Sequence, residues 1–271
     1  MLARKKIAVI GAGKLGETLI KALIEAKAVQ PEQITVTTRH PENSARKGKA
    51  YGVHASADNA AAAKGADIII VSVKPQVMAE ALASIKKVVG KNQIVISTAA
   101  SVSTAFIERA LGSGAPVIRT MPNTACLVRA GMTGICAGKR AGREHLALAE
   151  GIFAALGRVL ILDEKYMDAV TGLSASGVAF MYVTLESMAE GGVAAGLPRE
   201  IATELAAQTM LGAARMVLET REHPAKLKDV VTTPAGTTID GLMELETGGL
   251  RVTLIKSVLR ASKRAAELLH G

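Results

Sequence analysis

Ile7-Ala8-Val9-Ile10-Gly11-Ala12-Gly13-Lys14-Leu15-Gly16 is the stretch of sequence that decides the fold. Four apolar residues predict a strand, and the pattern G-x-G-x-x-G follows them and opens a helical stretch. In such a loop the first glycine permits a tight turn, the second lets the backbone approach a pyrophosphate, and the third lets the helix pack closely on the strand. We therefore predict that Gly11, Ala12, Gly13, Lys14, Leu15 and Gly16 bind a dinucleotide at the helix N-terminus. The alternative is a glycine-rich turn without a ligand.

The end of the second predicted strand, Ile34–Thr38, indicates which dinucleotide binds. A loop that prefers NAD has an acidic residue about 20 residues beyond the glycines, for the ribose 2′-hydroxyl. Here Arg39 stands at that place, after the hydroxyls of Thr37 and Thr38. A cation and hydroxyls suit a 2′-phosphate, so we predict that NADP(H) is preferred and NAD(H) is possible. The alternative is that Arg39 is a solvated loop residue.

Short β-branched runs alternate with helical stretches as far as residue 162, which is typical of βαβ units and a parallel sheet. The further predicted strands are Ile68–Val73, Ile94–Ser97 and Val117–Arg119, and then a pair at the sheet edge, Thr133–Ala137 and Val159–Leu162, with a helix over Arg143–Leu156 between them. The fold class is therefore α/β, with an N-terminal Rossmann-type doubly wound sheet over residues 1–163.

After Asp163 the β-branched runs stop and helical patterns follow. The predicted helices are Lys165–Ser174, Gly177–Ala195, Arg199–Thr220, Pro224–Val231, Ile239–Thr247 and Leu250–Leu269. Glycines and prolines mark their boundaries. We predict a separate all-α domain over residues 164–271.

Composition limits the classes of partner. The formal net charge is +9, but Lys and Arg are spread along the chain and aromatic residues make up only 2%, which disfavours nucleic acid. Cys126 and Cys136 lie ten residues apart without a cluster of metal-type partners, so we expect buried free thiols and no metal. The apolar run Ile7–Ile10 is too short for a signal peptide, and the neutral run after Asp168 contains serines, a threonine and glycines. We expect a cytoplasmic protein that does not cross a membrane.

Two polar stretches, Ser72–Gln76 and Arg119–Thr124, follow predicted strands at their carboxyl ends. In an open α/β sheet this edge forms the ligand crevice. We therefore predict that Val73, Lys74, Pro75, Met121 and Asn123 line the ribose and nicotinamide of the cofactor. Core packing of Met121 and an ordinary turn at Pro75 are the alternatives.

The loop within Leu227–Ile239 is rich in hydroxyls and leads into a predicted helix. It is a candidate carboxylate receptor, with free N–H groups from Gly236 and Thr237 and hydroxyls from Thr233 and Thr238. Helix capping by threonine would use the same residues for stability alone. His223, before Pro224, is expected to cap a helix and not to shuttle protons.

These stretches together resemble the pyrroline-5-carboxylate reductase family over almost the whole chain. The resemblance is carried by Gly11–Gly16, Val73–Gln76, Arg119–Thr124, Gly191–Arg199, Gln208-Thr209 with Gly212, and His223–Thr238. It implies NAD(P)H-dependent reduction of 1-pyrroline-5-carboxylate to L-proline by a cytosolic homo-oligomer, a homodimer through the helical domain or a higher assembly. It also implies that the loop with Thr233, Ala235, Gly236, Thr237 and Thr238 binds the substrate. Within it we expect Thr238 to be the donor near the imine.

The chain departs from the family pattern at Ala125, Ala175, Val178, Phe180 and Ala235. If a glycine with positive φ is usual at position 235, alanine there is strained or reshapes the loop. The departures leave two alternatives open: a reductase of a different cyclic imine, and a non-catalytic NADP-binding regulatory protein. A third alternative is a β-hydroxyacid dehydrogenase, whose chemistry uses a lysine on the first long helix of the second domain. No lysine occurs from Tyr166 through Glu222, which disfavours this alternative.

Overall fold

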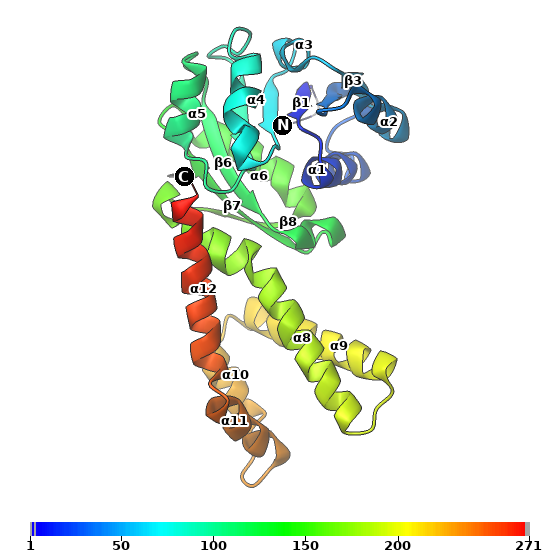
Figure 1. Ribbon diagram of the computed structural model, residues 1–271, viewed down its shortest axis with the longest axis vertical. Coiled ribbons are helices and arrows are strands. Elements are labelled where there is room, and N and C mark those ends of the chain that lie inside the picture. Colours follow the sequence, from blue (N-terminus) through cyan, green and yellow to red (C-terminus); the bar gives the residue numbers. More distant parts are fainter. Residues whose placement is uncertain (1, 3, 269–271) are drawn as a thin grey trace. The chain divides into compact units, whose positions relative to one another are not determined.

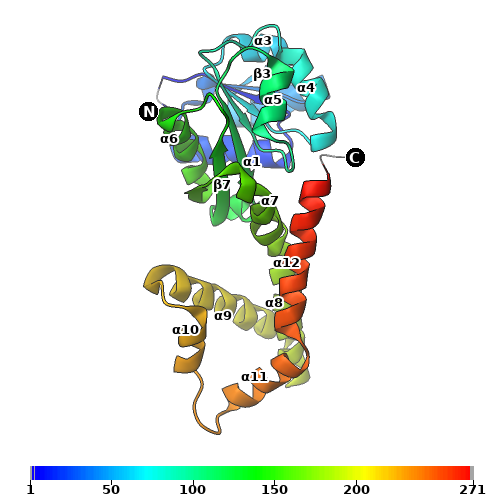
Figure 2. The same cartoon turned by 90° about the vertical axis from the view of Figure 1, so that its left-hand side faces the viewer.

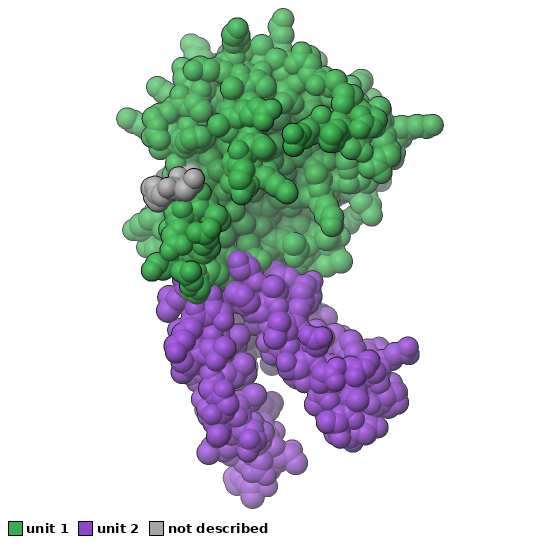
Figure 3. Space-filling view, viewed as in Figure 1, with its two compact units in different colours: residues 1–175, 260–271 green, residues 176–259 purple. Residues whose placement is uncertain are grey.

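The computed structural model describes residue 2 and residues 4–268 of the 271. The chain divides into two compact units, one of residues 1–175 with 260–271 and one of residues 176–259 (Figure 3). The domain boundary predicted after residue 163 stays a prediction.

The first unit contains one sheet of eight strands (Figure 1). The strands are β1 (Ile7–Ile10), β2 (Ile34–Thr37), β3 (His54–Ser56), β4 (Ile68–Val71), β5 (Ile94–Ser97), β6 (Val117–Pro122), β7 (Gly131–Ala137) and β8 (Gly157–Ile161). Their order is β3-β2-β1-β4-β5-β6-β7-β8, and only the β6–β7 pairing is antiparallel. The first six strands have the doubly wound order of a dinucleotide-binding domain, which confirms the predicted fold class.

Alternate residues of the central strands face two different layers of helices. On one face, Val9 and Ile70 belong to the core formed with α1 (Lys14–Glu25) and α6 (Arg143–Phe153). On the other, Ile10 and Ile69 pack with α3 (Asn59–Lys64), α4 (Met78–Ile85) and α5 (Thr104–Leu111). Because both faces are covered, the carboxyl ends of the strands are left as the place for a ligand.

The predicted strands are all present, and β1 and β5 have the predicted bounds. β3 was missed. It is only three residues long, has no β-branched side chain, and pairs with β2 at the sheet edge. β3 is held in the sheet by backbone hydrogen bonds to β2, so no apolar pattern marks it in the sequence.

Helices make up the second unit (Figures 1 and 2). They are α8 (Gly177–Ala194), α9 (Arg199–Thr220), α10 (Pro224–Val230), α11 (Thr237–Thr247) and the first part of α12 (Leu250–Glu267). The all-α prediction is confirmed for these residues; the predicted helix end at Leu269 lies outside the described residues. The helix predicted over 165–174 is a 3-10 turn (Glu164–Tyr166), α7 (Met167–Val170) and a π-helical turn (Thr171–Ala175), which leads into α8.

The second unit has a very small core of its own. Its buried apolar side chains are Ala189, Ala202 and Ala206 of α8 and α9. Large apolar side chains are exposed on the same helices, among them Tyr182, Val183, Leu205, Leu211 and Met216. By length and composition the stretch Glu164–Ala194 also meets the requirement for a membrane span, which the sequence analysis discounted. An exposed apolar surface of this extent is typical of an interaction surface.

Candidate active site

The phosphate loop joins β1 to α1, and its three glycines have three different surroundings. Gly11 has a φ of +80°, and a Cβ there would lie 2.4 Å from Cγ1 of Val73. A Cβ at Gly16 would lie 3.3 Å from Cγ1 of Val9. At Gly13, which is exposed, the nearest atom would be 3.9 Å away. The packing of the protein therefore accounts for Gly11 and Gly16, whereas Gly13 borders open space, as the approach of a pyrophosphate requires.

The loop is fixed to the end of β2, and its helix presents unpaired donors. The Ala12 N–H donates to the Thr37 carbonyl at 2.8 Å. Gly13 is the N-cap of α1 and supplies no side-chain cap, so the N–H groups of Lys14 and Leu15 have no acceptor within the helix. These donors and the helix dipole suit an anion.

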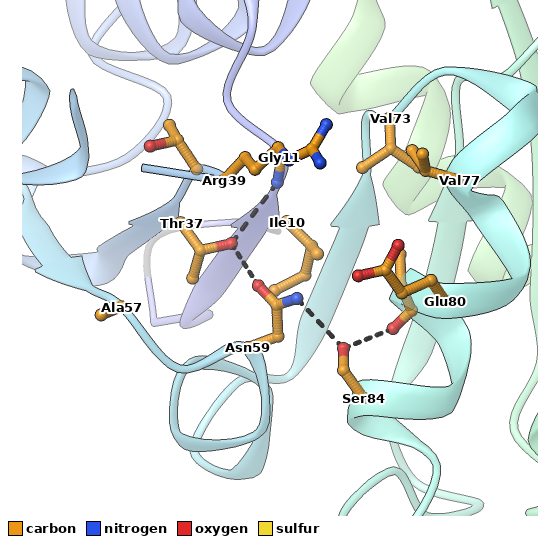
Figure 4. Close-up of a pocket in the computed structure, with 12 residues that line it drawn as sticks. Ile10, Gly11, Thr37, Arg39, Ala57, Asn59, Val73, Val77, Glu80 and Ser84 are labelled. Atoms are coloured by element: carbon orange, nitrogen blue, oxygen red, sulfur yellow. Dashed lines mark hydrogen bonds between the residues drawn. The ribbon is translucent and has the colours of Figure 1, made fainter. Parts of the chain in front are cut away.

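A pocket with an empty volume of about 730 Å³, partly open to solvent, lies beside the loop between the ends of β2 and β4 (Figure 4). Its lining residues come from β1, β2, α3 and α4 and from the segments that follow β2, β3 and β4: Ile10, Gly11, Thr37, Thr38, Arg39, Ala57, Asn59, Val73, Val77, Glu80, Ala81 and Ser84. The pocket thus brings together three predicted cofactor residues, Gly11, Arg39 and Val73.

A chain of hydrogen bonds crosses the floor of this pocket. The Thr37 hydroxyl donates to Oδ1 of Asn59 at 2.6 Å, and the Asn59 amide donates to the Ser84 hydroxyl at 3.0 Å. Ser84 in turn donates to the Ala81 carbonyl at 2.6 Å. Sequence reasoning missed Asn59 and Ser84. The carboxyl end of β3 would have pointed to Asn59, but β3 itself was not predicted.

Arg39 is the unpaired cation of the pocket. Its side chain is exposed and has no hydrogen-bond or ion-pair partner among the residues that the structure describes. The hydroxyls that were expected beside it are already engaged. The buried Thr37 hydroxyl donates to Asn59, and the Thr38 hydroxyl donates to the His40 carbonyl at 2.7 Å. The guanidinium alone is therefore free for a 2′-phosphate.

The predicted residues at the ends of β4 and β6 have different roles. Lys74 is exposed and Pro75 begins a 3-10 turn, next to Val73 in the pocket. Met121 is partly buried at the end of β6. The Asn123 amide donates to the carbonyl and the hydroxyl of Ser174, at 3.4 and 3.3 Å, and its oxygen accepts the Met132 N–H at 3.3 Å. Asn123 therefore also anchors the π-helical turn.

A buried ion pair fastens α7 to the sheet. Arg119 of β6 donates to Oδ1 of Asp168 at 3.0 Å, and its other terminal nitrogen lies 3.5 Å from Oε1 of Glu164. Only 4% of the Arg119 side chain is exposed. Glu164 also accepts the N–H and the hydroxyl of Thr104, at 2.7 and 2.6 Å. This cluster was not predicted from the sequence, because Thr104, Arg119 and the two carboxylates lie far apart in the chain.

The loop before α11 carries the predicted substrate residues. The Gly236 N–H donates to the Thr233 carbonyl at 3.1 Å and closes a turn, so the expectation of a free N–H at Gly236 is wrong. Ala235 has a φ of +53°, which is the left-handed region, so the condition stated for strain at this position is met. Gly236 is the N-cap of α11, and Thr237 and Thr238 are its first residues.

The Thr232 hydroxyl donates to the Lys228 carbonyl at 2.8 Å, whereas three other hydroxyls of this loop and the start of α11 are unused. Thr233, Thr237 and Thr238 have no side-chain hydrogen bond among the described residues. The alternative of side-chain capping is therefore not realised, because the cap residue is glycine. In contrast, His223 does cap α10 as expected, with Nδ1 accepting the Ala225 N–H at 3.2 Å.

Both cysteines are buried free thiols, as predicted. Burial, with the nearby Glu164 carboxylate, raises the pKa of Cys136 to about 12. Among the described residues no three His, Cys, Asp or Glu side chains are placed to hold a metal ion.

A Rossmann sheet, an open phosphate loop, an adjoining pocket with a free guanidinium and a helical unit define a dinucleotide-binding oxidoreductase. A family model described as pyrroline-5-carboxylate reductase dimerisation matches residues 164–268, and one described as NADP oxidoreductase coenzyme F420-dependent matches residues 6–101. The class predicted from the sequence, an NAD(P)H-dependent oxidoreductase, is confirmed.

Three relatives identify the family. The pyrroline-5-carboxylate reductase of Methanosarcina acetivorans is 44% identical over 98% of this chain and 99% of its own. The structure of the reductase from Coxiella burnetii has a TM-score of 0.90 at 36% identity and covers 97% of this chain and 98% of its own. The Plasmodium falciparum pyrroline carboxylate reductase, with NADP bound, has a TM-score of 0.89 at 27% identity and covers 99% of this chain and 100% of its own. The chain belongs to the pyrroline-5-carboxylate reductase family.

Proposed function

We propose that this chain reduces 1-pyrroline-5-carboxylate to L-proline with NAD(P)H, the last step of proline biosynthesis, in the cytoplasm. The observation that carries the proposal is the presence of two candidate binding features in one chain of this family. One is the open phosphate loop with its pocket; the other is the turn before α11 with its three unused hydroxyls.

The phosphate loop and pocket hold the cofactor. The donors at the start of α1 receive the diphosphate, and Arg39 receives the 2′-phosphate. Val73, Lys74, Pro75, Met121 and Asn123 border the ribose and nicotinamide. When bound, the reduced cofactor supplies a hydride to the imine carbon. This assignment favours NADPH over NADH, because the guanidinium has no competing partner among the described residues.

The turn before α11 holds the substrate. The Thr237 N–H at the start of the helix and the Thr233 hydroxyl receive the carboxylate, while Gly236 and Ala235 shape the turn. The Thr238 hydroxyl donates a hydrogen bond to the imine nitrogen, which gains electron density as its carbon takes up the hydride; a proton from solvent then completes the amine. The rest of the rate enhancement comes from holding the imine and the cofactor in attack geometry and from excluding water. The proposed reaction therefore requires no protein nucleophile and no metal.

The helical unit forms the contact between subunits. Its exposed apolar side chains on α8 and α9 and its match to a dimerisation model support a homodimer, on which a higher homo-oligomer can be built. Covering these side chains would also account for the apolar stretch Glu164–Ala194 without a membrane.

Two measurements on the purified protein test the proposal. NADPH oxidation is followed with 1-pyrroline-5-carboxylate, a six-membered cyclic imine carboxylate and a pyrroline without a carboxylate. We expect the first to be the best substrate and the last to be the poorest. A preference for the six-membered ring would favour the alternative, a reductase of a different cyclic imine, to which Ala235 and the other departures point. Tight NADPH binding in calorimetry without oxidation by any imine would favour a non-catalytic NADP-binding regulatory protein.

A further inference from the structure

The phosphate-binding helix α1 carries a carboxylate in its first turn, and a buried lysine neutralises it. Lys47 of α2 (Pro41–Tyr51) is 7% exposed, and its ammonium binds one oxygen of Glu17. The Tyr51 hydroxyl donates to the other oxygen of Glu17 at 2.9 Å. The hydrogen bond from Lys47, with that from Tyr51, holds the pKa of the Glu17 carboxyl below its ordinary value.

A carboxylate at this place works against the function of the helix. The N-terminus of α1 attracts anions through its unpaired N–H groups and its dipole. The negative charge of Glu17 interacts favourably with the same helix dipole. It would therefore compete with a diphosphate bound at the helix N-terminus and repel it. Lys47 removes that repulsion, and because its own charge is buried it needs Glu17 as a partner.

Lys47 lies on the helix that follows the segment carrying Arg39. α2 begins two residues after Arg39, and Ser44, one turn before Lys47, accepts the Thr38 N–H at 2.8 Å. Arg46, also on α2, is exposed and contributes a weaker attraction to Glu17. The buried positive charge that neutralises the Glu17 carboxylate is therefore that of Lys47.

We propose that Lys47 is a positioning residue for the cofactor diphosphate, which acts by cancelling the charge of Glu17 at the N-terminus of α1. The inference rests on the proposed dinucleotide site and does not depend on the imine that is reduced. It applies to NADPH and NADH alike, because both contain the diphosphate. Arg39, in contrast, is proposed to affect NADPH alone.

The test is the Kd of NADPH and of NADH, measured by calorimetry on four variants. Lys47→Met should raise both Kd values about three- to tenfold, because Glu17 is left uncompensated. The double variant Glu17→Gln/Lys47→Met should return both values to within about twofold of the starting protein. Lys49→Met removes the same charge from an exposed position of the same helix and should change neither value by more than about twofold. Glu17→Gln alone should leave both values unchanged or lower.

A double variant that binds as weakly as Lys47→Met would overturn the proposal, since Lys47 would then act only as a packing tie between α1 and α2. If Lys47→Met does not fold, Glu17→Gln decides, and a rise in either Kd overturns it. A loss confined to NADPH would also overturn it. None of these outcomes depends on whether any imine is reduced, so they are distinct from a failure of the proposed reaction.

Discussion

The Thr233 hydroxyl occupies the space where a side chain at Gly236 would stand, since a Cβ on Gly236 would lie 2.3 Å from Thr233 Oγ1. The same two residues are joined by the backbone hydrogen bond that closes the turn before α11. The turn therefore accepts only glycine at position 236 while Thr233 keeps its place.

Gly236→Ala should raise the KM for the imine at least about tenfold, because the new methyl group displaces the Thr233 hydroxyl and the start of α11. The Kd of NADPH should not change. Gly241→Ala is the matched control, since a Cβ at Gly241 meets nothing within 4 Å. Initial-rate kinetics at saturating NADPH measure both variants. An unchanged KM in Gly236→Ala would remove the turn from the substrate site.

Ala235→Gly should preserve or raise thermal stability, because alanine in the left-handed region costs about 1 kcal/mol relative to glycine. Greater flexibility of the unfolded chain offsets part of that gain. Ala235→Val should lower the Tm, because a β-branched side chain tolerates positive φ poorly. Thermal unfolding and the KM for the imine are measured together. A large rise of KM in Ala235→Gly at unchanged Tm would show that the Ala235 methyl group itself contacts the substrate.

Arg39→Ala should raise the KM for NADPH about tenfold or more and leave that for NADH nearly unchanged, because charge-assisted hydrogen bonds to the 2′-phosphate are lost. Arg46→Ala is the control, since Arg46 is exposed and hydrogen-bonded to Asn43 at 3.4 Å. Equal effects of Arg39→Ala on both cofactors would contradict the assignment.

Asp168→Ala should lower the free energy of unfolding by about 1–3 kcal/mol, because it leaves the buried Arg119 guanidinium short of an acceptor. Asp163→Ala should change it by less than about 0.5 kcal/mol, since the Asp163–Lys165 pair is exposed and 3.8 Å long. Denaturant titrations at one protein concentration give both values. Equal, small effects would show that Glu164 alone satisfies Arg119.

Alkylation of Cys136 should be much slower in the folded protein than in the unfolded chain at every pH between about 7 and 9, because its raised pKa of about 12 leaves far less reactive thiolate. In the unfolded chain the same reaction should accelerate as pH approaches the ordinary thiol pKa. Because the folded protein holds this proton more tightly, the contribution of the thiol to the free energy of unfolding is full below pH 9 and is lost as pH rises toward 12. Mass spectrometry after iodoacetamide treatment provides the measurement. Rapid native labelling at pH 8 would show that the site opens.

The sheet could be predicted because its strands are apolar, β-branched runs, which burial on both faces requires. The phosphate loop could be predicted because its glycine spacing is local in the sequence: Gly11 and Gly16 are required by close packing, and Gly13 leaves open space for a ligand. Asn59 and the Arg119–Asp168 pair could not, since their partners are distant in sequence and are chosen only by the folded arrangement. The surroundings of Gly236 could be predicted only in part. The sequence places it in a hydroxyl-rich loop, but the acceptor of its N–H depends on the turn that Ala235 adopts.

Because residues 176–259 bury only three alanine side chains in a core of their own, the stability of this protein should depend on its concentration. So few buried atoms cannot by themselves offset the entropy lost in ordering α8 to α11 and the first part of α12. If association supplies the missing burial, the midpoint of thermal unfolding should rise with protein concentration, as mass action requires. Newly made chains would then stay vulnerable to proteases until they meet a second copy.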